Sequence, residues 1–501
     1  MKSPVMDAEN SKLPSVLIIS LFLLMSVLSL LMHKPHLQKE IVSIHAWRQT
    51  QTQSTIISFL EEDFNILNPK RNDRGNGSGI FRMEFPLMQW VVAGISKFSG
   101  NVLLTTRTCM FLTGLLSVLG MYFLLFLLFG KPLPAIAGAW AFNFAPAFFY
   151  YTINPLPDNA ALCCGIWGLA AFLFWTKNKN WITLLFSAML LSLSALCKLP
   201  FMLYFSFPGI FLLREWYEGE KKSPFRIILL TIPALLPLAW YVKVIPTWKG
   251  NGIVGGVLDH PVSLGNYLDF AVHHLVSTLP ELLLNYASLP FFLCGLFLLW
   301  KNKSSKKRLF LPFLMLGISI LFYFFFELNM IEKIHDYYLF PFYPILFIIT
   351  CYGIIQWSTF KPVFFKGLLF LLILLMPLTA WLRMHKRWDE NSPGFNKDLL
   401  VYKDQLRKAV PDDELCIAGN DMSHFIFFYY IHKKGWGFDN DMIDLSQMQN
   451  MIKKGAKYLY SDCRVVDGSE NMKPYLDSLI FEAGSIKVFR LKTQAQIQLA
   501  N

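Results

Sequence analysis

The run LLTTRTCMFLTGLLSVLGMYFLLFLLF at residues 103–129 carries a single charge, Arg107, near its start. A helix that crosses a bilayer needs about 20 mostly apolar residues, so this run predicts a membrane span. Ten further runs pass the same test. The eleven predicted spans lie near residues 14–32, 103–129, 133–151, 159–176, 181–197, 199–213, 226–245, 283–300, 309–327, 338–358 and 363–382.

The composition of the whole chain agrees with these spans. Hydrophobic residues make up 54% of the sequence and charged residues 16%, whereas soluble proteins carry about 25% charged residues. A water-facing surface for 501 residues needs more charge than this, so we expect a polytopic α-helical membrane protein in a lipid bilayer. The net charge of +12 does not indicate a nucleic-acid partner, because Lys and Arg concentrate on the cytoplasmic side of membrane proteins.

The positions of the cations predict the orientation. With a cytoplasmic N-terminus, many Lys and Arg fall in cytoplasmic loops, among them Lys131, Lys177, Lys221, Lys301 and Arg308. Few fall in the opposite short loops: Lys198, Lys243, Lys249 and Lys333. Eleven spans then place the C-terminus on the outer side. We expect a multi-pass protein of the inner (plasma) membrane with a periplasmic or extracytoplasmic tail.

Three regions are therefore predicted on the outer face. They are a first loop at 33–102, a second at 246–282 and a tail at 385–501, which divides the chain into a transmembrane part, 1–384, and a separate domain, 385–501. Residues 41–60 and 85–98 of the first loop mix apolar and polar positions, which predicts helices lying in the membrane interface.

The tail is predicted to be a small α/β domain. Apolar runs at 414–418 and 457–460 predict strands, and the patterns of 396–410, 445–455 and 472–481 predict helices. Two loop segments, 419–424 and 434–437, suit acceptor recognition through their aromatic residues, although structural turns explain them equally well.

Ionisable residues cluster in three short outer segments. They are His45 to Gln49 after the first predicted span, Glu84-Phe85-Pro86, and Asn154 to Asp158. Carboxylates at membrane depth are costly and are usually functional, so Glu84 and Asp158 are predicted site residues. Arg48 has a simpler alternative as a cation that snorkels to the interface.

The order of these features resembles the GT-C membrane glycosyltransferases of the PMT-like type, over about residues 14–385. The resemblance rests on a long outer loop with an early Arg48, a later Glu84-Phe85-Pro86, the turn Asn154 to Asp158, and His335-Asp336-Tyr337-Tyr338 followed by Pro341. This group includes protein O-mannosyltransferases and the lipid A aminoarabinose transferase.

The resemblance implies transfer of a hexosyl or pentosyl group from a polyprenyl-phosphate donor to an acceptor hydroxyl, with inversion. A glycolipid, a polysaccharide and a protein are all open as acceptors. Arg48, Lys198, Tyr337 and Tyr338 match the family's donor phosphate-binding positions. Arg82 is a further cation without a clear counterpart there. Interfacial anchoring is the alternative for Lys198 and the two tyrosines.

Two positions depart from the resemblance. His45-Ala46 stands where many relatives have Asp-Glu, and Phe85 stands where they have Lys. The catalytic base is therefore open among His45, Glu84 and Asp158, because an imidazole with a pKa of about 6.5 suits proton abstraction. The remaining explanation of these two departures is that the protein has lost transferase activity.

No metal site or cofactor is predicted, since the outer-loop His and Asp residues lack zinc-like spacing. A divalent cation held by Glu84 and Asp158 stays open. Two other functions also compete: a flippase or transporter of lipid-linked sugars, and an O-antigen ligase or polymerase. A transporter would need polar residues along a path through the bilayer, whereas the mid-span positions are mostly apolar.

Overall fold

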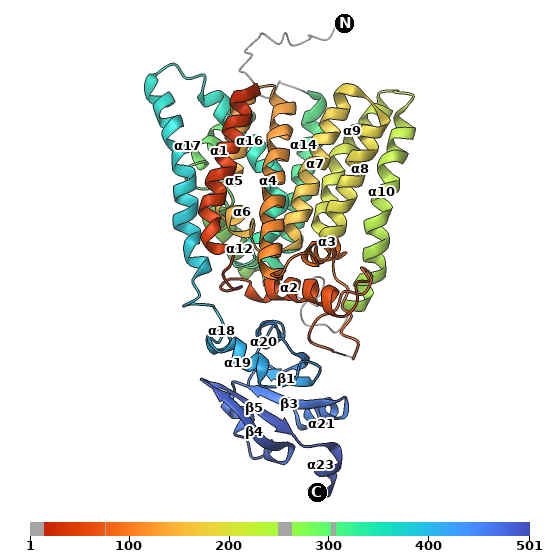
Figure 1. Ribbon diagram of the computed structural model, residues 1–501. Coiled ribbons are helices and arrows are strands. Elements are labelled where there is room, and N and C mark those ends of the chain that lie inside the picture. Colours follow the sequence, from red (N-terminus) through yellow and green to blue (C-terminus); the bar gives the residue numbers. More distant parts are fainter. Residues whose placement is uncertain (1–14, 76, 249–262, 302–306, 501) are drawn as a thin grey trace.

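Long apolar helices pack side by side, and a small sheet lies beyond one end of them in the computed structural model (Figure 1). The structure describes residues 15–75, 77–248, 263–301 and 307–500. Within these residues seven segments are long and apolar enough to cross a membrane. They contain α1 (Ser15–His33), α4 (Val102–Phe129), α7 (Pro157–Asn178), α10 (Ser223–Val244), α14 (Lys307–Phe326), α16 (Tyr343–Trp357) and α17 (Val363–Met384). The protein is a multi-pass membrane protein.

The other four predicted spans form shorter or interrupted helices, so the total of eleven stays a prediction. Residues 133–151 split into α5 (Pro132–Asn143) and α6 (Pro146–Tyr151). The reason is local: Ala145 is extended, with ψ of 120°, because a residue before proline avoids the helical region. The remaining three correspond to α8 (Trp181–Cys197), to the 3₁₀ helix η2 (Leu199–Phe205) with α9 (Ser206–Tyr217), and to α13 (Leu289–Lys301), whose predicted start, 283–288, lies outside that helix.

Small residues let some of these helices approach closely. In α13 and α16 two glycines face each other: a Cβ on Gly295 would lie 2.1 Å from Ile349 O, and one on Gly353 would lie 1.8 Å from Phe291 O. Backbones in contact gain van der Waals packing without a hydrophobic driving force, as is typical of membrane helices.

The predicted second outer loop is partly helical. Its described part contains the 3₁₀ helix η3 (Ile245–Trp248), α12 (Leu264–His273) and the π-helix η4 (His274–Leu283). Residues 249–262 of this prediction lie outside the described residues. Between α14 and α16 the chain forms α15 (Leu328–Ile331) and the 3₁₀ helix η5 (Asp336–Phe342).

The first outer loop follows a short 3₁₀ turn, η1 (Lys34–His36), and contains α2 (Ala46–Glu61) and α3 (Leu87–Ser96). Helix α2 lies across the end of the bundle, between the long helices and the tail (Figure 1). The prediction of a helix lying flat is confirmed. Most polar side chains of α2, including Arg48, Gln49 and Gln53, are buried by protein, because α2 packs against α3 as well as against α20 of the tail.

The tail begins with η6 (His385–Trp388) and forms a five-stranded sheet of order β2-β1-β3-β5-β4. Strands β1 (Leu415–Gly419), β2 (Lys434–Gly437) and β3 (Ala456–Ser461) are parallel, and β4 (Leu476–Ala483) and β5 (Ile486–Leu491) are antiparallel to their neighbours. The helical elements are α18 (Asp398–Val401), α19 (Lys403–Lys408), α20 (Ile426–Ile431), α21 (Leu445–Lys453), α22 (Arg464–Asp467), η7 (Lys473–Tyr475) and α23 (Gln494–Ala500).

The two predicted strands and the helix at 445–455 are confirmed, and the helix at 396–410 is broken into α18 and α19. The prediction of a helix at 472–481 was wrong, since most of it forms β4, which pairs with β5. Strand β4 is an exposed edge strand, so pairing with a neighbour decided its structure rather than a buried face.

Backbone hydrogen bonds join the tail to the first loop. Gly435 N donates to Asn72 O at 3.0 Å, and Arg74 N donates to Gly435 O at 2.6 Å. Gly435 is needed here because a Cβ at this residue would lie 1.7 Å from Cys416 O. The Tyr430 hydroxyl also donates to Ile41 O at 2.6 Å. The tail therefore holds the loop that carries α2.

Candidate functional site

The centre of the site is a buried ion pair between the first turn of α2 and the residues before α3. Arg48 Nη2 donates to Glu84 Oε1 at 2.7 Å, and 3% and 9% of the two residues are exposed. Burial opposes ionisation of both groups, but each stabilises the charge of the other. The pKa of Arg48 is therefore raised, and the pKa of Glu84 is lowered by Arg48 and Lys198.

A second, looser ion pair lies beside the first. Lys198 Nζ is 3.5 Å from Asp158 Oδ1. Asp158 is in the first turn of α7, where the helix dipole favours a carboxylate, and Lys198 follows the last residue of α8. The other oxygen of the carboxylate, Asp158 Oδ2, is buried and has no hydrogen-bond partner among the described residues. We call Arg48, Glu84, Asp158 and Lys198 the open cluster.

Two tyrosines of η5 border the open cluster. Lys198 Nζ lies over both rings, 5.7 Å from the centroid of Tyr337 and 4.9 Å from that of Tyr338. The Tyr337 hydroxyl is buried and has no partner within the described chain. The sequence prediction that places Tyr337 and Tyr338 next to the cations therefore agrees with the geometry.

His45 lies on the far side of Tyr337. Its Nε2 donates to Ile334 O at 2.9 Å, and its ring stacks on His335 at 4.9 Å and meets the Tyr337 ring edge-on at 5.0 Å. Burial lowers the pKa of His45 to about 4, so the imidazole is neutral near pH 7. With Nε2 as donor, Nδ1 is the basic nitrogen.

A further charged group, which the sequence analysis did not single out, holds this side of the site. Asp336 accepts hydrogen bonds from the Tyr151 hydroxyl at 2.7 Å and from Arg387 Nη1 at 2.9 Å, and its Oδ1 is 3.9 Å from His45 Nε2. We call Asp336, Arg387 and Tyr151 the closed cluster. Asp336 could have been found from the sequence, because it lies within the motif His335 to Tyr338. Arg387 could not, because it is one of several basic residues at the start of the tail.

Arg82 does not join either cluster. Its Nε donates to Leu67 O at 2.7 Å and its Nη2 to Asn68 Oδ1 at 3.1 Å, within the first loop. The proposal of Arg82 as a phosphate ligand is therefore not supported by its position. The side chain instead holds the turn before Pro69.

One cavity is lined by residues of the open cluster, and a second lies near Tyr338 in the chain. A narrow polar one, of about 20 Å³, is lined by Arg48, Glu84 and Gln89 and by Lys70 and Arg71 at its rim. Gln89 Nε2 donates to Glu84 Oε1 at 3.3 Å, but Gln89 Oε1 is buried without a partner in the described residues. This side of the cluster thus has unused hydrogen-bonding capacity.

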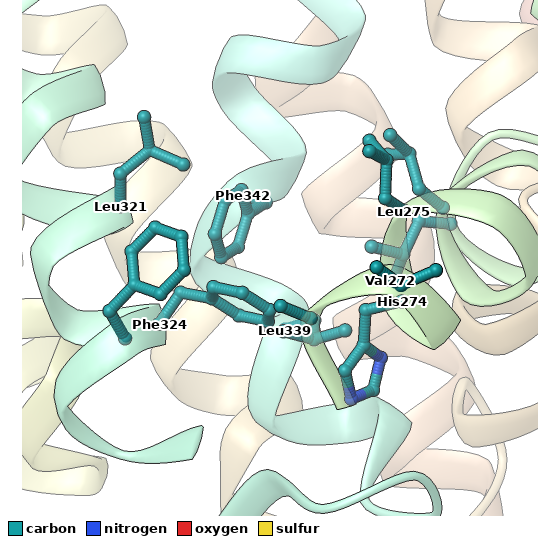
Figure 2. Close-up of a pocket in the computed structure, with 11 residues that line it drawn as sticks. Val272, His274, Leu275, Leu321, Phe324, Leu339 and Phe342 are labelled. Carbon is teal, nitrogen blue, oxygen red and sulfur yellow. The ribbon is translucent and has the colours of Figure 1, made fainter. Parts of the chain in front are cut away.

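The other cavity is an apolar groove of about 280 Å³ between η4, α14 and η5 (Figure 2). Its walls include Leu275, Leu321, Phe324 and Phe342, and His274 is the polar residue in its lining. Leu339 belongs to the lining and directly follows Tyr338, over which Lys198 lies. The lining of the groove includes neither cation of the open cluster, but Leu339 is the chain neighbour of Tyr338, which borders that cluster.

No group of three or more His, Cys, Asp or Glu side chains converges in the part of the chain that the structure describes. Glu84 and Asp158 belong to the same cluster, but each faces a cation. The arrangement is that of two carboxylates and two cations beside an apolar groove.

Comparison with known proteins places this arrangement in a known fold. The sequence profile of the dolichyl-phosphate-mannose-protein mannosyltransferase family matches residues 84–241. Among solved structures, ArnT from Cupriavidus metallidurans bound to undecaprenyl phosphate superimposes with a TM-score of 0.63 at 13% identity, covering 95% of this chain and 97% of the other. The chain has a PMT-like GT-C fold.

Two other solved proteins share the GT-C fold. The Archaeoglobus fulgidus oligosaccharyltransferase has a TM-score of 0.59 at 12% identity, over 93% of this chain and 73% of that protein. The arabinofuranosyltransferase AftD from mycobacteria also has a TM-score of 0.59 at 12% identity, over 96% of this chain and 40% of AftD. A search of curated protein sequences found no match. The part of this GT-C chain that the family profile matches includes Glu84, Asp158 and Lys198.

Proposed function

We propose that this protein is a glycosyltransferase that moves a hexosyl or pentosyl group from a polyprenyl-phosphate donor to an acceptor hydroxyl on the outer face of the membrane. The observation that carries the proposal is the open cluster: the buried cation Arg48, the partly buried cation Lys198 and two buried carboxylates. The fold is one in which ArnT was solved with undecaprenyl phosphate and an archaeal oligosaccharyltransferase with dolichol phosphate.

The cations suit the leaving group. Cleavage of the bond between the anomeric carbon and the phosphate oxygen leaves a polyprenyl phosphate that gains negative charge. Arg48 offers a planar set of donors that fits phosphate oxygens, and Lys198 offers a mobile point charge. The Tyr337 hydroxyl, which has no partner in the described residues, would add a neutral donor.

Asp158 is the base that the geometry favours. Asp158 Oδ2 has no partner among the residues that the structure describes, whereas Glu84 Oε1 accepts from Arg48 and Gln89. In the proposed step the acceptor hydroxyl gives its proton to Asp158, its oxygen bonds to the anomeric carbon from the side opposite the phosphate, and the configuration inverts. Glu84 would hold Arg48 in place, and His45 would pack against Tyr337 rather than receive the proton.

The apolar groove suits the isoprenoid tail of the donor. Its lining is apolar except for His274, and it lies among helices that the bilayer surrounds. A lipid chain in the groove would run past Leu339, the chain neighbour of Tyr338, over which Lys198 lies, so we propose that its phosphate reaches the open cluster.

We also propose that the end of the bundle with α2 and the sheet faces the periplasm and that the N-terminus is cytoplasmic in an inner membrane. The start of α1 and the sheet lie at opposite ends of the bundle (Figure 1). Single cysteines placed at Asp404 and at Lys177 would test this orientation in intact cells. An impermeant maleimide should label the first and spare the second, and the reverse result would contradict it.

The transferase function is tested with purified protein in lipid nanodiscs and a polyprenyl-phosphate sugar. The wild type should release polyprenyl phosphate and glycosylate an acceptor from an envelope extract. Asp158→Asn should reduce transfer by about 10² to 10⁴-fold, the usual contribution of a general base, and Asp404→Asn, on the exposed surface of the tail, should have no effect.

Three outcomes would reject the proposed function or the assignment of Asp158 as the catalytic base. Transfer by Asp158→Asn within twofold of the wild type would remove Asp158 from the mechanism. An inactive wild type with every donor tested would reject the transferase. Movement of the lipid across the bilayer without cleavage would instead identify a carrier.

A further inference from the structure

A second polar cavity lies on the other flank of α2, where the first loop meets the tail. It measures about 280 Å³, and its walls come from α2, the start of α4, and helices α19 and α20 of the tail. Gln53, Leu104, Arg407 and Tyr429 are among its lining residues. The volume is close to the lower end of the range for small-molecule sites, about 300 Å³.

Gln53 in this cavity is buried without partners. Only 1% of the residue is exposed, and neither its Nε2 nor its Oε1 forms a hydrogen bond within the described residues. A buried amide without partners costs about 1–3 kcal/mol, so such groups are rare unless a ligand or water completes them. The three rotatable bonds of the side chain let the amide meet a molecule that enters.

The opposite wall offers further free donors and acceptors. Tyr429 lines the cavity with 6% of the residue exposed, and its hydroxyl can both donate and accept a hydrogen bond. Arg407 donates from Nε to Tyr430 O at 2.8 Å, which leaves its terminal amino groups available. Glu40 contributes a carboxylate that already pairs with Lys403.

We propose that this cavity binds a sugar unit of a glycan acceptor. An amide with both atoms unused requires a partner that donates and accepts, and a sugar hydroxyl does both. Ile57, Leu60 and Leu103 add an apolar wall for the carbon face of the ring. The charged side chains of the lining have both signs, Glu40 and Glu61 against Arg407, so a neutral polyol fits better than a phosphate.

The position of the cavity suits a sugar unit of the acceptor other than the one that reacts. Gln53 follows Arg48 by five residues on α2, which is roughly 7.5 Å along the helix and about 140° around it. The cavity and the open cluster thus lie on different faces of one helix. The inference rests on the proposed transferase function, with the tail supplying Tyr429 and Arg407 to the acceptor site.

Binding is measured first, because it does not depend on catalysis. Saturation-transfer NMR on the full-length protein in nanodiscs would use two probes: the lipid-free oligosaccharide released by mild acid from an envelope glycolipid, and a threonine-containing peptide. The oligosaccharide should receive saturation. Gln53→Leu and Tyr429→Phe should each weaken its binding by about three- to tenfold, as expected for one lost hydrogen bond.

Matched controls are Gln447→Leu, on the exposed side of α21, and Tyr217→Phe, at the end of α9, which should bind as the wild type does. Three outcomes would overturn the inference: no saturation of the oligosaccharide, unchanged binding in both cavity variants, or binding of the peptide instead. A cavity filled by water alone gives the first or second result.

Kinetics separate this inference from the proposed function. Without acceptor, the donor is hydrolysed slowly by water, and this reaction requires the open cluster but not the cavity. Gln53→Leu should leave donor hydrolysis unchanged and raise the acceptor KM by about three- to tenfold. If the wild-type protein does not hydrolyse the donor, the result counts against the transferase function. If Gln53→Leu is active and its acceptor KM is unchanged, the result counts against the cavity alone.

Discussion

The open and closed clusters flank the same residue, Tyr337, and consist of similar groups, yet their hydrogen bonding differs. In the closed cluster each oxygen of Asp336 has a donor, the Tyr151 hydroxyl at 2.7 Å and Arg387 at 2.9 Å. In the open cluster Lys198 is 3.5 Å from Asp158, and Asp158 Oδ2, Gln89 Oε1 and the Tyr337 hydroxyl lack partners in the described chain.

This difference distinguishes a structural ion pair from a ligand site. Buried polar groups are normally satisfied, and each exception requires an explanation. The closed cluster joins η6, the start of η5 and the end of α6, so its saturation fits a role in holding these elements together. The unused atoms of the open cluster are those that a phosphate and a hydroxyl would satisfy.

The largest expected effect is on stability and concerns the closed cluster. Arg387→Met leaves the Asp336 carboxylate buried without its cation, which costs about 3–5 kcal/mol. Thermal unfolding in detergent should therefore shift to clearly lower temperature. Donor KM in the protein that remains folded should not change. Adding Asp336→Asn should restore part of the stability, and equal stability of Arg387→Met and wild type would show that the closed cluster is not structural.

The next effect concerns Arg48 in the open cluster. Arg48→Met removes a charge-assisted donor from the departing phosphate, and loss of one such donor costs about 10² to 10³ in kcat. Single-turnover transfer measures this directly. Arg214→Met, at the other end of the bundle, is the matched control. A fall in stability with transfer unchanged would make the open cluster a structural pair like the closed one.

Lys198 should have a smaller effect, because it is the looser partner. Lys198→Met is expected to raise the donor KM by about tenfold or more, the value of a hydrogen bond to a charged group, and Lys198→Arg should recover most of it. Titration with polyprenyl phosphate as a competitive inhibitor supplies the affinity. If KM stays the same and kcat falls, Lys198 acts in the transition state rather than in binding.

The smallest effect concerns the contact between the first loop and the tail. His424 Nδ1 is 3.7 Å from Asp73 Oδ2. Burial opposes the imidazolium, but Asp73 raises the pKa of His424 above 6.5. The pair therefore stabilises the fold fully below pH 6.5, and this stability is lost as the pH rises through the raised pKa.

His424→Gln should accordingly lower stability by about 0.5–1 kcal/mol at pH 6 and by nearly nothing at pH 9. Thermal unfolding at the two pH values, with His385→Gln as a control outside this interface, measures the difference. A difference that grows with pH would contradict the sign of the predicted effect.

Some of the fold was predictable because it depends on local pattern. The run at 103–129 forms α4, and the run at 363–382 lies within α17, since length and apolar content suffice to define a span. The predicted strands at 414–418 and 457–460 are confirmed as β1 and β3, because a short apolar run is also a local signal. In the site, Glu84 and Asp158 were recognised by their charge at membrane depth and Arg48 and Lys198 by the family resemblance, and the structure brings the four side chains together.

Other features depended on partners distant in the sequence. Residues 472–481 have Met472, Tyr475, Leu476 and Leu479 at helical spacing, and pairing with β5 still makes most of the segment a strand. The closed cluster joins Asp336 to Arg387 across α16 and α17, and the contact of α2 with α20 was not predictable because the tail starts more than 300 residues later.

The sequence by itself determined that the chain spans a membrane, where its longest apolar helices lie, and which charges lie near the ends of spans. These properties follow from the free energy of transferring each segment from water into lipid, which depends only on the residues of that segment. Only the tertiary structure decided which carboxylate is saturated and which keeps a free oxygen, because hydrogen-bond satisfaction depends on where distant segments meet.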